Sequence, residues 1–306
     1  MFAALVAGAL LGLSTPSQDP PALPSTPDPE AATRLSDVVV SARDLEERTR
    51  ALVDEMAAPA NHRGLARWGG RVCVGAVNVR QEVAQAMIDR VSRLAADLNL
   101  RVGEPGCTPN VVLIFTEDAQ GMSRAMVEQD RRAFHNGIGG LDRGRAALDA
   151  FQNGDAPVRW WHVSLPVVGA TGARAIRFPG DGPVFVPGEG RVNRGRPITD
   201  VLNKVLIVVD VDQLEGVSLP QLSDYVAMVA MAQIDPDGDT AAHDTVLNLF
   251  SDPLGVDGLS DWDAVYLQAL YDSAWERVNP SGQAAAIARV VRRAERDQAR
   301  RERTAQ

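Results

Sequence analysis

The sequence predicts an α+β domain built on a mixed β-sheet, and two features carry this prediction. A β-branched segment, 71–77, is followed by an amphipathic segment, 80–100, and by a continuous apolar run, 111–118. This strand–helix–strand order predicts a βαβ unit, in which two parallel strands are joined by a right-handed crossover. A later segment, 218–233, is apolar around its whole circumference. A helix without a polar face is expected to lie buried inside the domain.

The N-terminal residues are typical of a secretory signal followed by a linker. Residues 2–13 form an apolar run. It is shorter than the roughly 20 residues that a membrane-spanning helix needs, and it has the length of a signal-peptide core. No basic residue precedes it, so either the signal is atypical or translation starts elsewhere. We expect a signal peptide over 1–17, a Pro-rich disordered linker over 18–35, and export to the periplasm or the extracellular space.

Composition limits the classes of protein that remain. With 45% hydrophobic and 23% charged residues, the chain can bury a core, and we expect one domain over 36–278. The net charge of −9 argues against nucleic acid as a partner, because a phosphate backbone is bound by concentrated positive charge.

The two cysteines, Cys73 and Cys107, are expected to form a disulfide. They lie at the start of the first strand of the predicted βαβ unit and just before the second. These two ends are neighbours in a parallel pair, and export supplies an oxidising compartment.

The remaining elements follow from local patterns. Strands are expected at 158–168 and 204–210, and helices around 42–57, 121–134, 142–151, 218–233 and 260–273. The Gly- and Pro-rich segment 169–200 is too long for a structureless loop. We expect "RAIRF" (174–178) and "PVFV" (183–186) to pair across "PGDG" as an edge ribbon.

The C-terminal segment, 279–306, is predicted to be a basic helix. From Arg289 to Arg303 it holds seven arginines against three acidic residues. Its apolar residues, Ile287, Val290 and Val291, form a patch that we expect to be too small to anchor it, so the helix should be dispensable for the fold. Binding to anionic lipid or to an acidic partner is its alternative role.

Three aspartates on alternate positions, Asp235, Asp237 and Asp239, raise the question of a calcium loop. An EF-hand loop needs Gly at position 6 and Glu at position 12, where this chain has Thr240 and Val246. The stretch is therefore interpreted as a polar turn after a helix, with adventitious cation binding as the alternative.

The order of these elements, together with "LSDWDAVYLQALY", is similar to zinc-peptidase domains of the zincin and metzincin type. In those domains the active-site helix follows the sheet and is followed by a helix with a Leu-Ser-x-x-Asp and Leu-x-x-Leu-Tyr pattern. The matching residues are Leu259, Ser260, Asp263, Leu267, Leu270 and Tyr271. The chain also resembles exported bacterial proteins of unknown function that share segments of the "RVCVG", "PGC.PN" and "YVAMVAMAQID" type. The resemblance implies a zincin-like fold over 71–273, with a substrate cleft between the edge ribbon and the 218–233 helix.

The zinc motif of those families is missing. A zincin helix carries two histidines one turn apart, with a glutamate beside the first as general base. The best register puts Asp224, Tyr225 and Met228 at these positions, and Met231 and Ile234 at the later Gly and third His. We therefore expect no zinc and no cofactor.

The four histidines, His62, His135, His162 and His243, show no metal-ligand spacing and are interpreted as surface or satisfied core residues. The sequence thus predicts a non-catalytic binding or structural protein, with a peptide or a protein as the partner in the cleft. The alternative is a hydrolase with an unrecognised site. Its first candidate residues are Asp210, Asp212, Asp224 and Tyr225. Asp210 and Asp212 end a strand, where catalytic carboxylates often sit but where carboxylates are also common turn formers.

Overall fold

The computed structural model describes residues 55–57, 63–134, 143–168, 172–175, 185–186, 190–191, 198–272, 285–293, 296–297 and 300. All of them belong to one compact unit, 41–306. The predicted signal peptide, the linker and most of the 42–57 helix lie outside this part of the chain.

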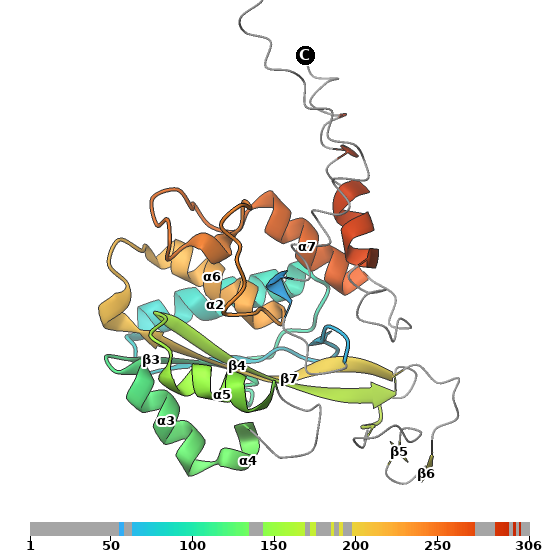
Figure 1. The fold of residues 1–306 in the computed structure, drawn as a ribbon, viewed down its shortest axis with the longest axis horizontal. Coiled ribbons are helices and arrows are strands. Elements are labelled where there is room, and N and C mark those ends of the chain that lie inside the picture. Colours follow the sequence, from blue (N-terminus) through green and yellow to red (C-terminus); the bar gives the residue numbers. More distant parts are fainter. Residues whose placement is uncertain are drawn as a thin grey trace, which may run out of the picture. The chain divides into compact units, whose positions relative to one another are not determined.

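A mixed five-stranded sheet forms the centre of the fold (Figure 1). Its longest strand, β7 (Ile198–Asp210), pairs on one side with antiparallel β4 (Val158–Val168). On the other side, β7 pairs with two parallel strands, first β1 (Arg67–Trp68) and then β3 (Val111–Thr116). Strand β2 (Val74–Val77) pairs in parallel with β3. The expected α+β class with a mixed sheet is therefore confirmed.

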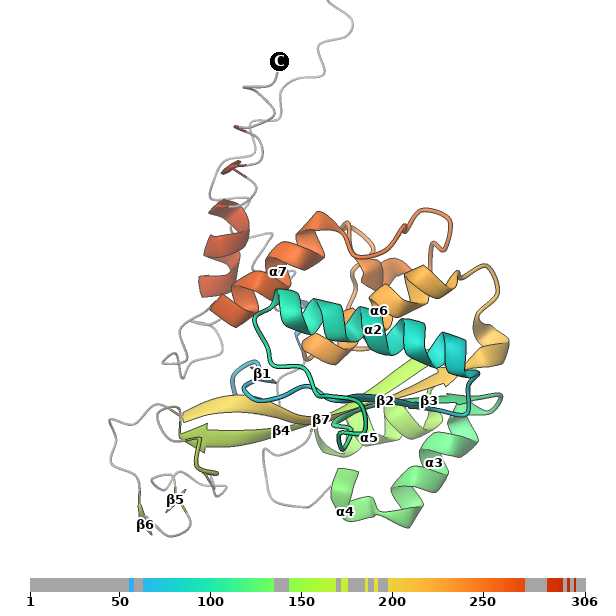
Figure 2. The same ribbon diagram turned by 180° about the vertical axis from the view of Figure 1, so that it is seen from behind.

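Helices cover both faces of the sheet (Figures 1 and 2). One face carries α2 (Gln81–Asp97), α6 (Leu219–Met231) and α7 (Asp261–Asp272). The other carries α3 (Ala119–Gln129), α4 (Arg131–Phe134) and α5 (Gly144–Asn153). Successive side chains of a strand point to opposite faces. Trp160 accordingly joins the core under α6, and Trp161 joins the smaller core under α3 to α5.

The βαβ prediction is confirmed by β2, α2 and β3, and the predicted disulfide joins Cys73 and Cys107 with their Cα atoms 6.2 Å apart. The backbone carbonyl of Cys73 accepts N–H groups of Asn110 and Val111 at 2.9 and 3.0 Å. The disulfide thus ties the start of β2 to the loop that enters β3.

Helix α6 is the predicted buried helix, and every residue from Tyr225 to Ala232 is buried. It begins with a capping box, in which the Ser218 hydroxyl accepts the Gln221 N–H and the Gln221 side chain accepts the Ser218 N–H. A capping box satisfies two of the N–H groups that a helix start leaves unpaired.

The carbonyl groups at the end of a helix also lack partners within the helix. In α6 they are satisfied by aromatic side chains from three other elements. His162 Nε2 donates to Val229, Trp68 Nε1 donates to Ala230 and the Tyr271 hydroxyl donates to Met231, each at 2.8 Å. These bonds let α6 end inside the core with its last carbonyl groups paired.

Two predictions are corrected. Among the described residues, strand β5 (Phe185–Val186) pairs with β6 (Gly190–Arg191), downstream of it, whereas the described part of "RAIRF" pairs elsewhere. Of that segment the structure describes Arg174 and Ala175, which pair with β4. The physical reason is that the sequence offers a second Pro-Gly turn signal, "PGEG", directly after β5.

The second correction concerns the C-terminal helix, whose residues 285–293 are helical. Ile287, Ala288 and Val291 are buried, and Ile287 and Val291 belong to the main core. The expectation that its apolar patch is too small to pack is therefore wrong. These residues are spaced i, i+1 and i+4, so they lie on one face of the helix, while Val290 is exposed.

Candidate functional site

The aspartate-rich stretch after α6 is a polar turn, as predicted. The Asp235 carboxylate accepts Arg143 Nη2 at 2.8 Å and the Asp237 N–H at 3.2 Å. Its own N–H donates to the carbonyl of Met56 at 2.7 Å. Across the described residues, no group of three or more His, Cys, Asp or Glu side chains is placed to hold a metal ion.

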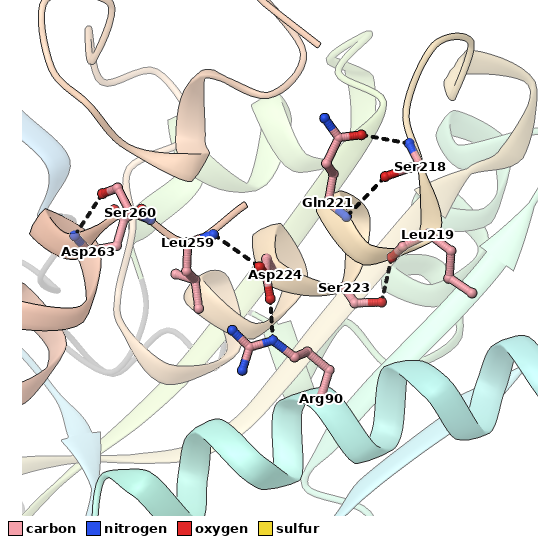
Figure 3. Close-up of polar contacts among 9 residues, drawn as sticks. All are labelled: Arg90, Ser218, Leu219, Gln221, Ser223, Asp224, Leu259, Ser260 and Asp263. Carbon is pink, nitrogen blue, oxygen red and sulfur yellow. Dashed lines mark hydrogen bonds and ion pairs between the residues drawn. The ribbon is translucent and has the colours of Figure 1, made fainter. Parts of the chain in front are cut away.

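The α6 positions at which the predicted zincin resemblance would require metal ligands serve the packing of the domain, as Figure 3 shows for Asp224. Asp224 forms an ion pair with Arg90 of α2 and accepts the Leu259 N–H at 3.0 Å. The ring of Tyr225 lies edge-on to Phe250 with centroids 5.0 Å apart, and Met228 is fully buried. Burial raises the pKa of Tyr225 above its usual value, so its hydroxyl stays protonated.

The Leu-Ser-x-x-Asp motif is a capping box at the start of α7 (Figure 3). Ser260 Oγ accepts the Asp263 N–H, and Asp263 Oδ2 accepts the Ser260 N–H, both at 3.0 Å. Asp263 also accepts the Val246 N–H at 2.8 Å and the Thr245 hydroxyl at 2.6 Å. The motif therefore fixes the loop before α7, and burial raises the pKa of Asp263 although these hydrogen bonds oppose the rise.

The carboxyl ends of β3 and β7 form a topological switch point, on the right of Figure 2. Strand β3 leads into α3 on one face of the sheet, whereas β7 leads towards α6 on the opposite face. In open α/β sheets, ligands bind outside the carboxyl ends of the strands at such a point. This edge of the sheet is therefore the leading candidate for a ligand-binding site.

Asp210 ends β7 at this edge and is 6% exposed. Its carboxylate accepts the Gln213 amide at 3.1 Å, the Asp212 N–H at 3.2 Å and the Ala119 N–H at 3.4 Å. Asp210 thus connects β7 to the start of α3. Asp212 is exposed and lies in the turn that follows.

Arg159 of β4 lies beside Asp210 on the face covered by α3 and α5. Arg159 pairs with Val208 of β7, which belongs to the core under α3 to α5. Asp210 lies two residues beyond Val208 on the same strand. Side chains at this diagonal of an antiparallel pair are about 7–8 Å apart at most. Arg159 is 5% exposed, and its Nε and Nη1 atoms are buried without a hydrogen-bond partner among the residues that the structure describes.

Burial lowers the pKa of Arg159, and the charges of Asp210, Asp155 and Asp118 oppose this shift. Arg124 of α3 adds a second positive charge nearby. The Asp118 carboxylate accepts the Gly121 N–H at 2.7 Å as the N-cap of α3. The edge thus combines a buried guanidinium with a rim of carboxylates.

The structure separates the four residues that the sequence singles out. Asp210 lies near Arg159 at the carboxyl edge and Asp212 follows it in the exposed turn, while Asp224 and Tyr225 make their contacts with α2, Leu259, Trp160 and Phe250. Arg159 is a candidate site residue that the sequence did not predict. The sequence signal for this residue is that Arg159 is the one charged residue in "VRWWHV" (158–163), a segment whose other residues are apolar or aromatic.

The two histidines within the described part of the chain, His162 and His243, have ordinary structural roles. His162 is the buried donor to α6, and His243 is partly exposed in the loop that follows the aspartate-rich turn. His62 and His135 lie outside the described residues.

Comparison with known proteins finds no match to this chain among protein-family models, curated proteins or solved structures. Among the helices described, none has the length and apolar character needed to cross a membrane. The site is therefore interpreted from its own geometry.

Proposed function

We propose that the protein is an exported, non-catalytic binding protein with a zincin-like architecture that lacks the zinc site. The observation that carries this proposal is the use of the α6 positions for packing. The sheet-then-helix order of the zincin resemblance is present in β4, β7, α6 and α7, and the disulfide is compatible with export.

The residues at the α6 positions do not fit a catalytic zinc ion. Such an ion needs three protein ligands and one water molecule. Asp224 already pairs with Arg90, and the thioether of Met228 is a poor zinc ligand in a fully buried position. Tyr225 is not a base, because its hydroxyl is protonated. These side chains therefore do not support a zinc-dependent hydrolytic step at this helix.

We propose the carboxyl edge of β3 and β7 as the binding site, in place of the cleft beside Tyr225 that the sequence suggested. The side chains of Asp224 and Tyr225 are engaged within the domain. At the edge, by contrast, Arg159 keeps two buried N–H groups without acceptors. Most buried polar groups in native proteins have partners, so an unpartnered buried guanidinium at a switch point supports a ligand there.

Metal analysis of the purified protein, paired with a peptidase screen, tests the non-catalytic part of the proposal. We expect far less than one zinc ion per chain after dialysis, no change in melting temperature with chelator, and no peptide turnover. One zinc per chain that is lost in Asp224→Ala but kept in the exposed control Asp257→Ala would restore the hydrolase hypothesis.

A further inference from the structure

We propose that the carboxyl edge binds a small zwitterionic ligand of the free amino-acid class, with its carboxylate on Arg159 and its ammonium group on Asp118 and Asp155. This inference rests on the proposed binding function. It adds the chemical class of the ligand.

The buried donors of this face require acceptors. Within the described part of the chain, Nε and Nη1 of Arg159 have none, and neither does Ser123 Oγ, which lies one helical turn from Ala119 on the sheet-facing side of α3. Leaving a buried donor unsatisfied costs about 1–3 kcal/mol, and more when the group is charged. A carboxylate offers two oxygens and about four lone pairs, and it can pair with a guanidinium group through two parallel hydrogen bonds.

Strand register places these groups together. In the last rows of the sheet, Thr116 is opposite Asp210, and Val208 is opposite Arg159. All four side chains lie on the α3 face, because they alternate with residues of the main core such as Phe115 and Val209. Arg159 therefore lies one row inside the polar end of the sheet, under the first turn of α3.

The charges around Arg159 disfavour ligands that carry only positive or only negative charge. A simple anion meets the carboxylates of Asp118, Asp155 and Asp210, and a simple cation meets the guanidinium groups of Arg159 and Arg124. A zwitterion places each of its charges against the opposite charge of the site.

The rim supplies the acceptor for the ammonium group. Asp155 is exposed in the connection from α5 to β4, and Asp118 uses Oδ1 to cap α3. Asp155 makes no side-chain hydrogen bond or ion pair within the part of the chain that the structure describes. Its carboxylate is the rim group most available to a ligand.

Calorimetry and thermal-shift titrations of the full chain with each standard amino acid test the inference. Inorganic phosphate, glucose and ethylammonium are the anionic, neutral and cationic comparison probes. We expect at least one amino acid to bind saturably. Its N-acetylated and amidated forms, which lack one of the two charges, are expected to bind far more weakly.

Two variants connect binding to the proposed residues. Asp155→Asn should weaken amino-acid binding by about fivefold, as expected for an exposed ion pair. Arg159→Met should weaken it by about a hundredfold, because Arg159 is a buried charged partner. The exposed controls Asp257→Asn and Arg93→Met should bind like the wild type. Circular dichroism checks folding, and Asp155→Asn decides the question if Arg159→Met does not fold.

If phosphate, glucose or ethylammonium binds saturably and no amino acid binds, the zwitterionic ligand class is wrong. The proposed binding function would still stand. Binding of an amino acid that is insensitive to both variants overturns the site. If no probe binds, the inference fails and the proposed binding function loses its support as well.

Discussion

Acidification should destabilise this protein through one buried side chain, His162. The imidazole is 3% exposed and donates from Nε2 to the carbonyl of Val229 near the end of α6. Burial lowers its pKa from 6.5 to about 4, the hydrogen bond to Val229 opposes this shift, and the charge of Arg143 adds to it. Between these two pKa values, the unfolded chain binds a proton that the folded chain does not.

The magnitude follows from the difference in pKa. Each pKa unit corresponds to about 1.4 kcal/mol, so the change from 6.5 to about 4 is worth about 3 kcal/mol in total. The sign is that of a depressed pKa. Stability is fully present above pH 6.5 and is lost as the pH falls towards 4. At pH 5, we expect a loss of about 2 kcal/mol from His162 alone.

Urea denaturation at pH 7, 6 and 5 measures this loss. His162→Gln keeps an N–H donor but does not titrate in this range, so the free energy of unfolding should fall less with acid than in the wild type. Leu254→Gln, at a side chain that is 94% exposed and does not titrate, is the control and should retain the wild-type pH dependence. Equal pH dependence in wild type and His162→Gln would refute the reasoning, because other groups would then account for the acid sensitivity.

Three further predictions concern the fold. Reducing the disulfide should lower the free energy of unfolding by about 3–4 kcal/mol, and two free thiols in denatured, unreduced protein would contradict the bond itself. Val229→Asp should abolish soluble expression because it places an unpaired charge in the core. Leu254→Asp, at a side chain that is 94% exposed, is the control and should express normally. Normal folding of Val229→Asp would argue against a buried α6. Truncation after residue 284 removes the fully buried Ile287 and Val291 and should lower the melting temperature by about 10 °C. An unchanged melting temperature would show that this helix adds no stability.

The elements that the sequence predicts well are those whose pattern is local. The βαβ unit is readable because β-branched and apolar runs flank an amphipathic helix, and the disulfide follows once the strands are parallel. Ser218 and Ser260 are readable as helix caps because capping is a contact within one turn. The burial of α6 follows from its lack of a polar face.

The features that depend on pairing between distant segments are less accessible. The partner of β5 depends on which of two Pro-Gly signals closes the ribbon, and local residues do not distinguish them. The C-terminal helix packs through Ile287 and Val291, which join a core built mainly from distant segments of the chain. Arg159 meets Asp210 only through the register of β4 on β7, which no residue pattern encodes by itself.

Strand β7 is the centre of the sheet, yet residues 198–210 come late in the chain. Three of the other four strands pair directly with it, and β2 reaches it only through β3. Until β7 has been synthesised, β2–β3 is the one pair of this five-stranded sheet that can form, and a two-stranded pair is marginally stable at best. For the exported protein that we propose, this order of strands delays folding during translation. A nascent chain without a core is a chain that a secretion channel can still accept in extended form.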